Sequence, residues 1–285
     1  AIHLDIPYLL TGDILGDAVE TLTWTRVLLA LWLVLSLSQW LVVARQFAPD
    51  GLMPRGRMKR ALSQAAPVGG HRLLSPGPMR GFFAVQLLLA IVLAASDSGP
   101  VAIGCLVILI ACQAGFTNLT GQFWVDGSDK IGIIVMAGTL LALIGVATAD
   151  PGVILAGILL TGGQLVISYF VAGVSKMFVP AWRDGTRLKA ILSTRAWGSE
   201  RLAGGLKVPG FAAAAAWAVI LLEALFPLAL LAPQAWLLLA LGSMLAFHFA
   251  TAFLMGLNKF PWAFAAAYPA VILLGRVVRS AAGLD

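Results

Sequence analysis

Apolar residues run along this chain in long blocks that are separated by shorter polar segments. The blocks do not alternate apolar and polar positions, as the strands of a membrane barrel do. A block of about 20 apolar residues is long enough to cross a bilayer as a helix. The pattern therefore predicts eight spanning helices, at about 24–44, 82–96, 100–116, 131–149, 152–176, 211–232, 235–256 and 260–278.

Composition supports a membrane protein over a soluble one. Hydrophobic residues make up 60% of the 285 residues, and charged residues make up 11%. A soluble domain is about half apolar and about a quarter charged, so this chain has too few charges to cover a soluble surface. We expect an all-α, polytopic membrane helix bundle that forms a single domain over 1–285.

The basic residues gather in two of the connections between these blocks. Residues 45–80 hold seven Lys or Arg and one acid, and residues 177–210 hold six and two. The positive-inside rule places both loops in the cytoplasm and both termini outside. This distribution explains the net charge of +6 without any nucleic-acid partner. Residues 1–23 contain no Lys or Arg, and we expect them to lie at the membrane interface.

The second basic loop contains a short amphipathic pattern. Its stretch GTRLKAILSTRAWGSERL spaces Leu188, Ile191, Leu192 and Trp197 as one face of a helix, among Arg and Lys. Such a helix is typical of a segment that lies on the membrane surface. We therefore expect an interfacial helix in this loop.

Arg26, two residues after Trp24, is expected to snorkel to the interface. Besides it, Lys176, Glu223 and His248 stand out as ionisable residues inside or at the end of predicted spans. Charged groups are expensive in a bilayer and are candidates for function by default. Each also has a structural interpretation. Lys176 could snorkel to the interface, Glu223 could form a structural hydrogen bond or an ion pair between helices, and His248 could be a hydrogen-bonded packing residue. His248 has no second His, Cys or carboxylate near it in the sequence, which argues against a tight metal site.

Helical spacing leaves the role of Lys176 open between two interpretations. Tyr169, seven residues earlier, shares its face, and Ala172 and Gly173 are small enough for another helix to approach closely. If Lys176 faces inward and is desolvated, it could act as a base near neutral pH. If it faces outward, it only anchors the helix end.

Two motifs in this chain resemble a known membrane family. The segment SYFVAGVSKMFVPAWRDGTRL is similar to the Tyr-Phe-x-Ala-Gly-Val-x-Lys and Trp-x-x-Gly segment of vitamin K-dependent γ-glutamyl carboxylase and of the bacterial HTTM (horizontally transferred transmembrane) family. The segment FHFATAFLMGLNKFPW is similar to the family's His followed about a dozen residues later by Phe-Pro. The segments FAPDGLMPRG and WVDGSDKI are weaker matches.

The resemblance implies a helix bundle whose polar residues face an interior cavity. In the carboxylase, the matching lysine deprotonates vitamin K hydroquinone as the first step of an oxygen-dependent carboxylation of glutamate. The resemblance therefore implies Lys176 as a base and His248 as a residue that orients an intermediate. Tyr169, Glu223 and Trp182 are expected to line the same pocket. It also implies a quinone or hydroquinone as the cofactor, although the residues themselves do not identify one.

Two classes of function stay open at this point. The first is a membrane-embedded, possibly carboxylase-like enzyme with a pocket for a quinone-like or lipidic molecule, placed in a bacterial inner membrane. The second is a non-catalytic structural or assembly subunit of a larger respiratory or photosynthetic complex. This second reading is favoured by Ser175, which stands where the family has another lysine. The bilayer is the expected partner in both cases, with other membrane subunits in the second.

Overall fold

A computed structural model describes residues 12–48, 50–51, 75–120, 126–194, 198, 208 and 210–284 of the chain. Its elements are α2 (Gly12–Val43), η1 (Ala44–Phe47), α4 (Pro76–Ala95), α5 (Gly99–Thr120), α6 (Gly127–Thr148), α7 (Pro151–Met177), α8 (Pro180–Arg183), α9 (Thr186–Leu192), α11 (Phe211–Ala224), η4 (Phe226–Leu230), α12 (Gln234–Met255) and α13 (Phe260–Ala281). The described ranges contain helices and no strand. The expected all-α polytopic bundle is therefore confirmed.

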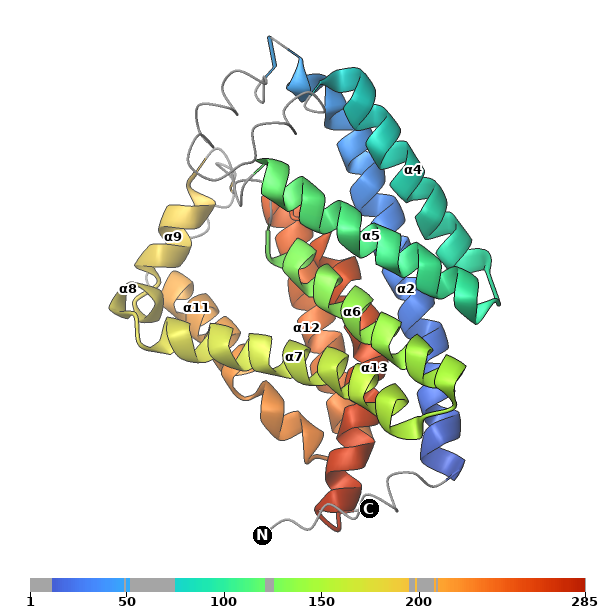
Figure 1. The fold of residues 1–285 in the computed structure, drawn as a ribbon. Coiled ribbons are helices and arrows are strands. Elements are labelled where there is room, and N and C mark those ends of the chain that lie inside the picture. Colours follow the sequence, from blue (N-terminus) through green and yellow to red (C-terminus); the bar gives the residue numbers. More distant parts are fainter. Residues whose placement is uncertain are drawn as a thin grey trace.

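Seven of the described helices are long and apolar enough to cross a membrane: α2, α4, α5, α6, α7, α12 and α13. The chain is therefore an integral membrane protein. In Figure 1, α2, α4 and α5 form one side of the bundle, and α8, α9 and α11 form the opposite side. Helices α6, α7, α12 and α13 lie between these two groups.

The structure differs from the expected span 211–232, because the helix in this segment is interrupted. Helix α11 has 14 residues and ends at Ala224, and the chain continues as the 3-10 helix η4. Pro227 explains the break, since a proline has no amide proton and its ring clashes with the carbonyl four residues earlier. That earlier residue is Glu223, which thus comes to lie in the last turn of α11.

The start of the chain also differs from the expectation for residues 1–23. Residues 1–11 lie outside the described ranges, whereas residues 12–23 continue without a break into the first span as part of α2. Two contacts hold this extension on the bundle. Ala18 and Leu22 are buried in the core, and Asp17 accepts a hydrogen bond from Arg276 of α13.

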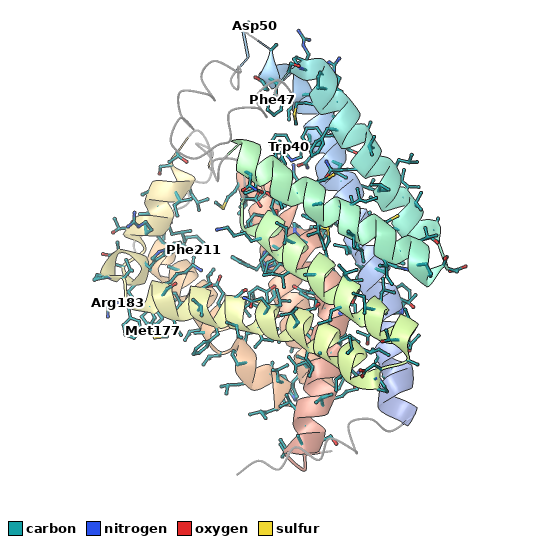
Figure 2. The ribbon with its side chains drawn as sticks, in the orientation of Figure 1. Trp40, Phe47, Asp50, Met177, Arg183 and Phe211 are labelled. Atoms are coloured by element: carbon teal, nitrogen blue, oxygen red, sulfur yellow. The ribbon has the colours of Figure 1, made fainter. Side chains whose placement is uncertain are left out.

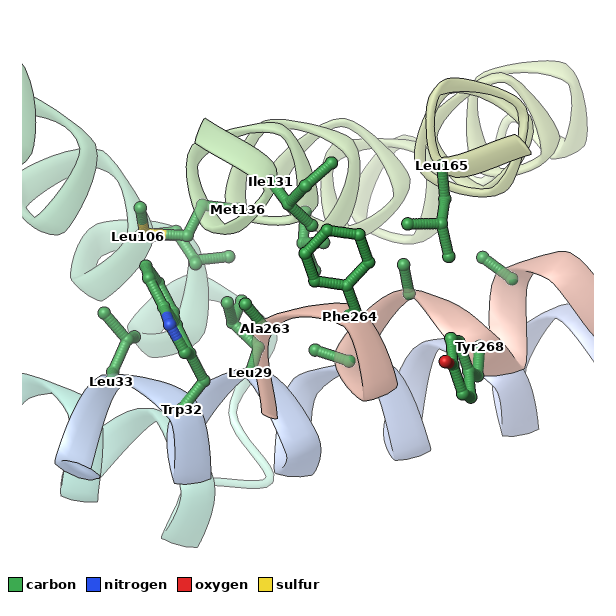
Figure 3. Packing of buried hydrophobic residues seen from close by; sticks show 14 of the residues in the cluster. Leu29, Trp32, Leu33, Leu106, Ile131, Met136, Leu165, Ala263, Phe264 and Tyr268 are labelled. Atoms are coloured by element: carbon green, nitrogen blue, oxygen red, sulfur yellow. The ribbon is translucent and has the colours of Figure 1, made fainter. Parts of the chain in front are cut away.

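The core between α2, α5, α6 and α13 is made of large apolar side chains packed against small residues. Trp32 of α2 is fully buried and lies close to Leu106 and Met136 (Figure 3). A Cβ on Gly132 of α6 would lie 2.0 Å from the Trp32 ring, so the indole occupies the space that this glycine leaves.

A second aromatic group closes the end of the bundle where α2 gives way to η1. Trp40 stacks on Phe83 with ring centroids 5.5 Å apart and meets Phe116 edge-on at 5.0 Å. Phe47 lies beside Trp40 at 6.5 Å. Figure 2 shows Trp40 and Phe47 at this end, away from Met177, Arg183 and Phe211 at the corner formed by α7, α8 and α11.

Helix α7 makes close backbone contacts with three neighbouring helices. A Cβ on Gly157 would lie 2.4 Å from the carbonyl oxygen of Gly138 in α6, and one on Gly162 would lie 2.7 Å from that of Ala270 in α13. A Cβ on Gly173 would lie 2.3 Å from the amide nitrogen of Ala224 in α11. Small residues at such positions let membrane helices pack tightly, as was expected for Gly173.

We expect Gly157→Ala to destabilise the bundle, because its methyl group would meet backbone atoms that cannot rotate away. Overpacking of this kind costs about 1–3 kcal/mol. Gly163→Ala in the same helix is the control, since a Cβ there meets nothing within 4 Å. Both variants gain about 1 kcal/mol of helix propensity, because alanine favours a helix over glycine. Thermal unfolding in detergent, monitored by circular dichroism, gives the melting temperature of each variant. Equal melting temperatures for the two variants would contradict the close α6–α7 contact.

Candidate functional site

Lys176 faces the interior of the bundle rather than a free helix end. Its Nζ donates a hydrogen bond of 2.5 Å to Oε2 of Glu223, 47 residues later in the chain. The Lys176 side chain is 19% exposed and that of Glu223 is 7% exposed. Helices α7 and α11 approach closely at Gly173, one turn before Lys176, and at Ala224, directly after Glu223, and this approach makes the contact possible.

The ion pair resolves the energetic problem that each charge poses inside an apolar bundle. An unpaired buried charge costs several kcal/mol, and a well-placed opposite charge offsets most of that cost. Trp182 of α8 adds a further contact, because Nζ of Lys176 lies 5.6 Å from the centroid of its ring. Lys176 is thus enclosed by a carboxylate on one side and an aromatic ring on another.

A chain of polar side chains lies farther along the same face of α7. The Tyr169 hydroxyl lies 3.0 Å from Nε2 of His248 in α12 and 3.3 Å from the hydroxyl of Tyr268 in α13. His248 is 3% exposed, and its ring centroid lies 4.0 Å from that of Phe264. Three helices that are far apart in sequence therefore contribute to one buried hydrogen-bonded chain.

Except for Tyr268, these polar groups border one cavity of about 560 Å³. Its walls come from α6, α7, α8, α9, α11, α12 and α13 and are mostly apolar. The five residues singled out from the sequence all line it: Tyr169, Lys176, Trp182, Glu223 and His248. The structure brings these residues together, whereas their chemical roles stay predictions.

The expected interfacial helix of the second basic loop is described only in part. Helix α9 has seven residues, and Trp197 lies outside the described ranges. Leu188 and Ile191 of α9 line the cavity, and Leu192 is buried against Ala212 of α11. The apolar face of α9 therefore covers the cavity, which differs from the expected contact with the membrane surface. Periodicity indicates an apolar face but not the surface that this face meets.

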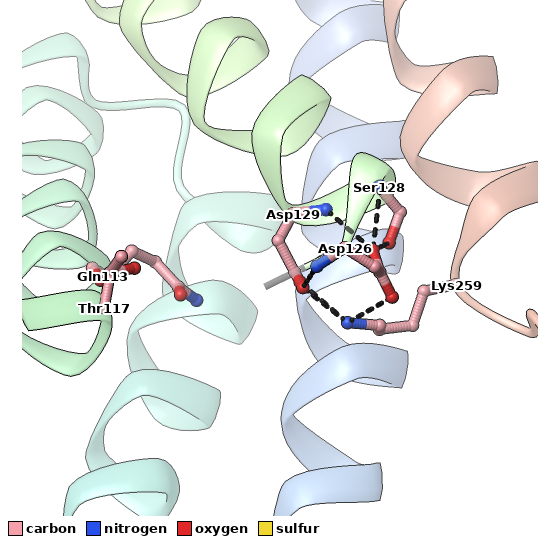
Figure 4. A network of polar contacts seen from close by, with 6 residues as sticks. All are labelled: Gln113, Thr117, Asp126, Ser128, Asp129 and Lys259. Atoms are coloured by element: carbon pink, nitrogen blue, oxygen red, sulfur yellow. Dashed lines mark hydrogen bonds and ion pairs between the residues drawn. The ribbon is translucent and has the colours of Figure 1, made fainter. Parts of the chain in front are cut away.

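A second charged cluster lies at the start of α6 (Figure 4), next to residues that line the cavity. Lys259, between α12 and α13, contacts both carboxylate oxygens of Asp129 at 2.8 Å and Oδ2 of Asp126 at 3.2 Å. Its neighbours Leu257 and Phe260 line the cavity, as does Gly127 beside Asp126. The cluster therefore fastens the α12–α13 connection to α6 at the rim of the cavity.

Local sequence explains why α6 begins at this cluster. The Asp126 side chain accepts hydrogen bonds from the amides of Ser128 and Asp129, and Asp129 accepts one from the amide of Asp126. This reciprocal capping box satisfies amides that have no partner within the helix. Burial alone would raise the pKa of the Asp126 carboxyl, but the Lys259 ammonium and the Ser128 hydrogen bond outweigh burial and hold that pKa below its usual value.

Sequence reasoning did not identify Lys259, Asp126, Asp129 or Tyr268 as members of the site. A signal existed for the first three, because GLNKFPW and WVDGSDKI are both segments of the family resemblance and an acid pair three residues apart is typical of a helix start. Nothing in the pattern around Tyr268 distinguishes it from a packing residue. The pairings themselves join residues as much as 130 positions apart.

Comparison of the chain with models of known protein families, with curated proteins and with solved structures gives no match.

Replacement of Lys259 by methionine should destabilise the protein, because two neighbouring carboxylates, Asp126 and Asp129, then lose the ammonium group that they share. Buried charged groups left without a partner cost about 1–3 kcal/mol. Lys130→Met is the matched control, since Lys130 is exposed and lies next to Asp129 without an ion pair in the described ranges. Thermal unfolding in detergent compares the stabilities of these two variants. A Lys259→Met protein as stable as the Lys130→Met protein would show that the cluster does not hold the rim together.

Proposed function

We propose that this chain is an HTTM-like membrane protein whose cavity binds a quinone-like or lipidic molecule, with Lys176 and Glu223 as the acid–base pair that meets its polar group. The observation that carries the proposal is a mostly apolar cavity with a buried ion pair in its wall. Ligand pockets are commonly apolar, with a few polar groups that fix orientation. The resemblance to the carboxylase and to the HTTM family covers the segments around Lys176 and His248, and both residues line this cavity. It also supports a bacterial inner membrane as the location.

The residues present fit a quinone-like group. A cavity of about 560 Å³ falls within the usual range for small-molecule sites, and its aromatic walls suit a planar ring. The ammonium of Lys176 can donate to an oxygen, and so can a protonated ring nitrogen of His248. Nδ1 of His248 is buried without a hydrogen-bond partner among the described residues. A quinone would supply redox chemistry that the side chains lack.

The ion pair defines what the protein's own groups can do with a proton. While the proton stays on Lys176, the ammonium is a hydrogen-bond donor and not a base. When Glu223 takes this proton across the 2.5 Å contact, Lys176 becomes a neutral amine that can accept a proton from a hydroxyl. Glu223 is therefore the group that makes the proposed base role of Lys176 possible.

Binding of menadione, a naphthoquinone, tests the proposal through quenching of tryptophan fluorescence, since Trp182 lines the cavity. We expect the unmodified protein to bind it and Lys176→Met to weaken binding by about tenfold, which corresponds to one lost charged hydrogen bond. Lys189→Met is the charge-matched control, because Lys189 is exposed on α9. Equal affinities for all three proteins would contradict the proposal and favour a structural subunit.

In the same experiment, the Lys176→Arg variant distinguishes the role of Lys176 as a positive charge from its proposed role as a base. Guanidinium keeps the positive charge but does not release its proton near neutral pH. We therefore expect the Lys176→Arg protein to retain most menadione binding. If Lys176 is a base, we expect the unmodified protein to take up oxygen with the reduced form, menadiol, and the Lys176→Arg protein to lose this activity.

A further inference from the structure

In the hydrogen-bonded chain of Tyr268, Tyr169 and His248, the atoms in contact restrict which group donates and which accepts. Each tyrosine hydroxyl has one proton to donate, and a neutral imidazole carries a proton on only one of its two nitrogens. The contacts are Tyr268 to Tyr169 at 3.3 Å and Tyr169 to Nε2 of His248 at 3.0 Å. No other hydrogen bond of these three side chains occurs within the ranges that the structure describes.

Three proton arrangements fit these contacts, and they differ in what they leave unsatisfied. In the first, Tyr268 donates to Tyr169 and Tyr169 donates to Nε2, so that the proton of the imidazole lies on Nδ1. Every hydroxyl proton then has an acceptor. Only the Nδ1–H group lacks a partner, and it belongs to a residue that lines the cavity.

The two other arrangements place the imidazole proton on Nε2, which then donates to Tyr169. Either Tyr169 donates onward to Tyr268, whose own proton has no acceptor, or Tyr268 also donates to Tyr169, whose proton has none. All three arrangements leave one buried donor proton without an acceptor, but these two also leave the lone pair on Nδ1 without a donor. The first arrangement therefore has the fewest unsatisfied groups and is favoured, because each unsatisfied buried polar group is costly.

We propose that Tyr169 holds His248 as the Nδ1–H tautomer, so that His248 offers a hydrogen-bond donor to an acceptor oxygen of the bound molecule. The inference rests on the proposed function, because it describes the ligand of the same cavity. It adds a chemical restriction to that ligand. While it keeps its proton, Lys176 is a second donor in the wall, so we expect the bound molecule to carry oxygens that accept hydrogen bonds. Tyr169 is a positioning residue that acts through His248.

The tautomer can be measured without any ligand. The chain has three histidines, so replacing His3 and His71 by glutamine leaves His248 as the only one. In protein labelled with ¹⁵N-histidine and solubilised in detergent, NMR distinguishes a protonated ring nitrogen from an unprotonated one by its chemical shift. We expect a protonated Nδ1 and an unprotonated Nε2. An Nε2–H tautomer or a doubly protonated ring would overturn the assignment.

Two matched tyrosine substitutions identify which hydroxyl sets the tautomer. Tyr169→Phe removes the donor to Nε2, and we expect the Nε2–H form to become populated. Tyr268→Phe is the control, since Tyr169 still has Nε2 as its acceptor, and we expect the Nδ1–H form to persist. A Tyr169→Phe protein that keeps the pure Nδ1–H form would overturn the positioning role of Tyr169, even if its stability had fallen.

Ligand binding tests the donor role separately. We expect Tyr169→Phe to weaken menadione binding by about tenfold, as one lost hydrogen bond does, and Tyr268→Phe to leave it nearly unchanged. The affinity for 2-methylnaphthalene, the same ring without oxygens, should be similar in all three proteins. A menadione affinity that is unchanged by Tyr169→Phe would overturn the donor role while ligand binding stands. Failure of menadione to bind even the unmodified protein would instead overturn the proposed function, and with it the donor role, while the NMR result would still decide the tautomer.

Discussion

The site depends on how closely α7 can approach the helices around it. Glycines on α7 remove the side chains that would otherwise separate its backbone from those of α6, α13 and α11. The contacts at Gly157 and Gly162 place α7 in the middle of the bundle, and the contact at Gly173 brings α11 alongside its last turns. In a bilayer, where apolar surface gains little by leaving lipid, such close packing is a main source of helix association.

This packing explains why the polar groups can lie inside the bundle at a tolerable energetic cost. Lys176 and Glu223 neutralise each other across the α7–α11 contact, and Tyr169 of α7 joins His248 of α12 and Tyr268 of α13 by hydrogen bonds. The cavity lies between these two groups and is bordered by both. Its polar atoms are therefore positioned by helices rather than by loops, which favours a fixed binding geometry.

Much of the architecture could be predicted because it depends on hydrophobicity summed over about 20 residues. The interruption at Leu225 was not predicted, because Pro227 lies within an apolar run whose hydropathy does not reveal the end of a helix. The cost of charge in a bilayer singled out Lys176, Glu223 and His248, but not the partner of each. The Lys176–Glu223 pair joins residues 47 positions apart, and the sequence indicates a close approach at Gly173 without specifying that α11 is the helix that approaches.

The most direct test of this account is a double-mutant cycle on the ion pair. Lys176→Met and Glu223→Leu should each lower the free energy of unfolding in detergent by about 1–3 kcal/mol, since each leaves one charge without its partner. The double variant should lose clearly less than the sum of the two, because no unpaired charge is left. Losses that add to within about 0.5 kcal/mol would show that the two residues act independently, and would contradict a buried pair at the centre of the site.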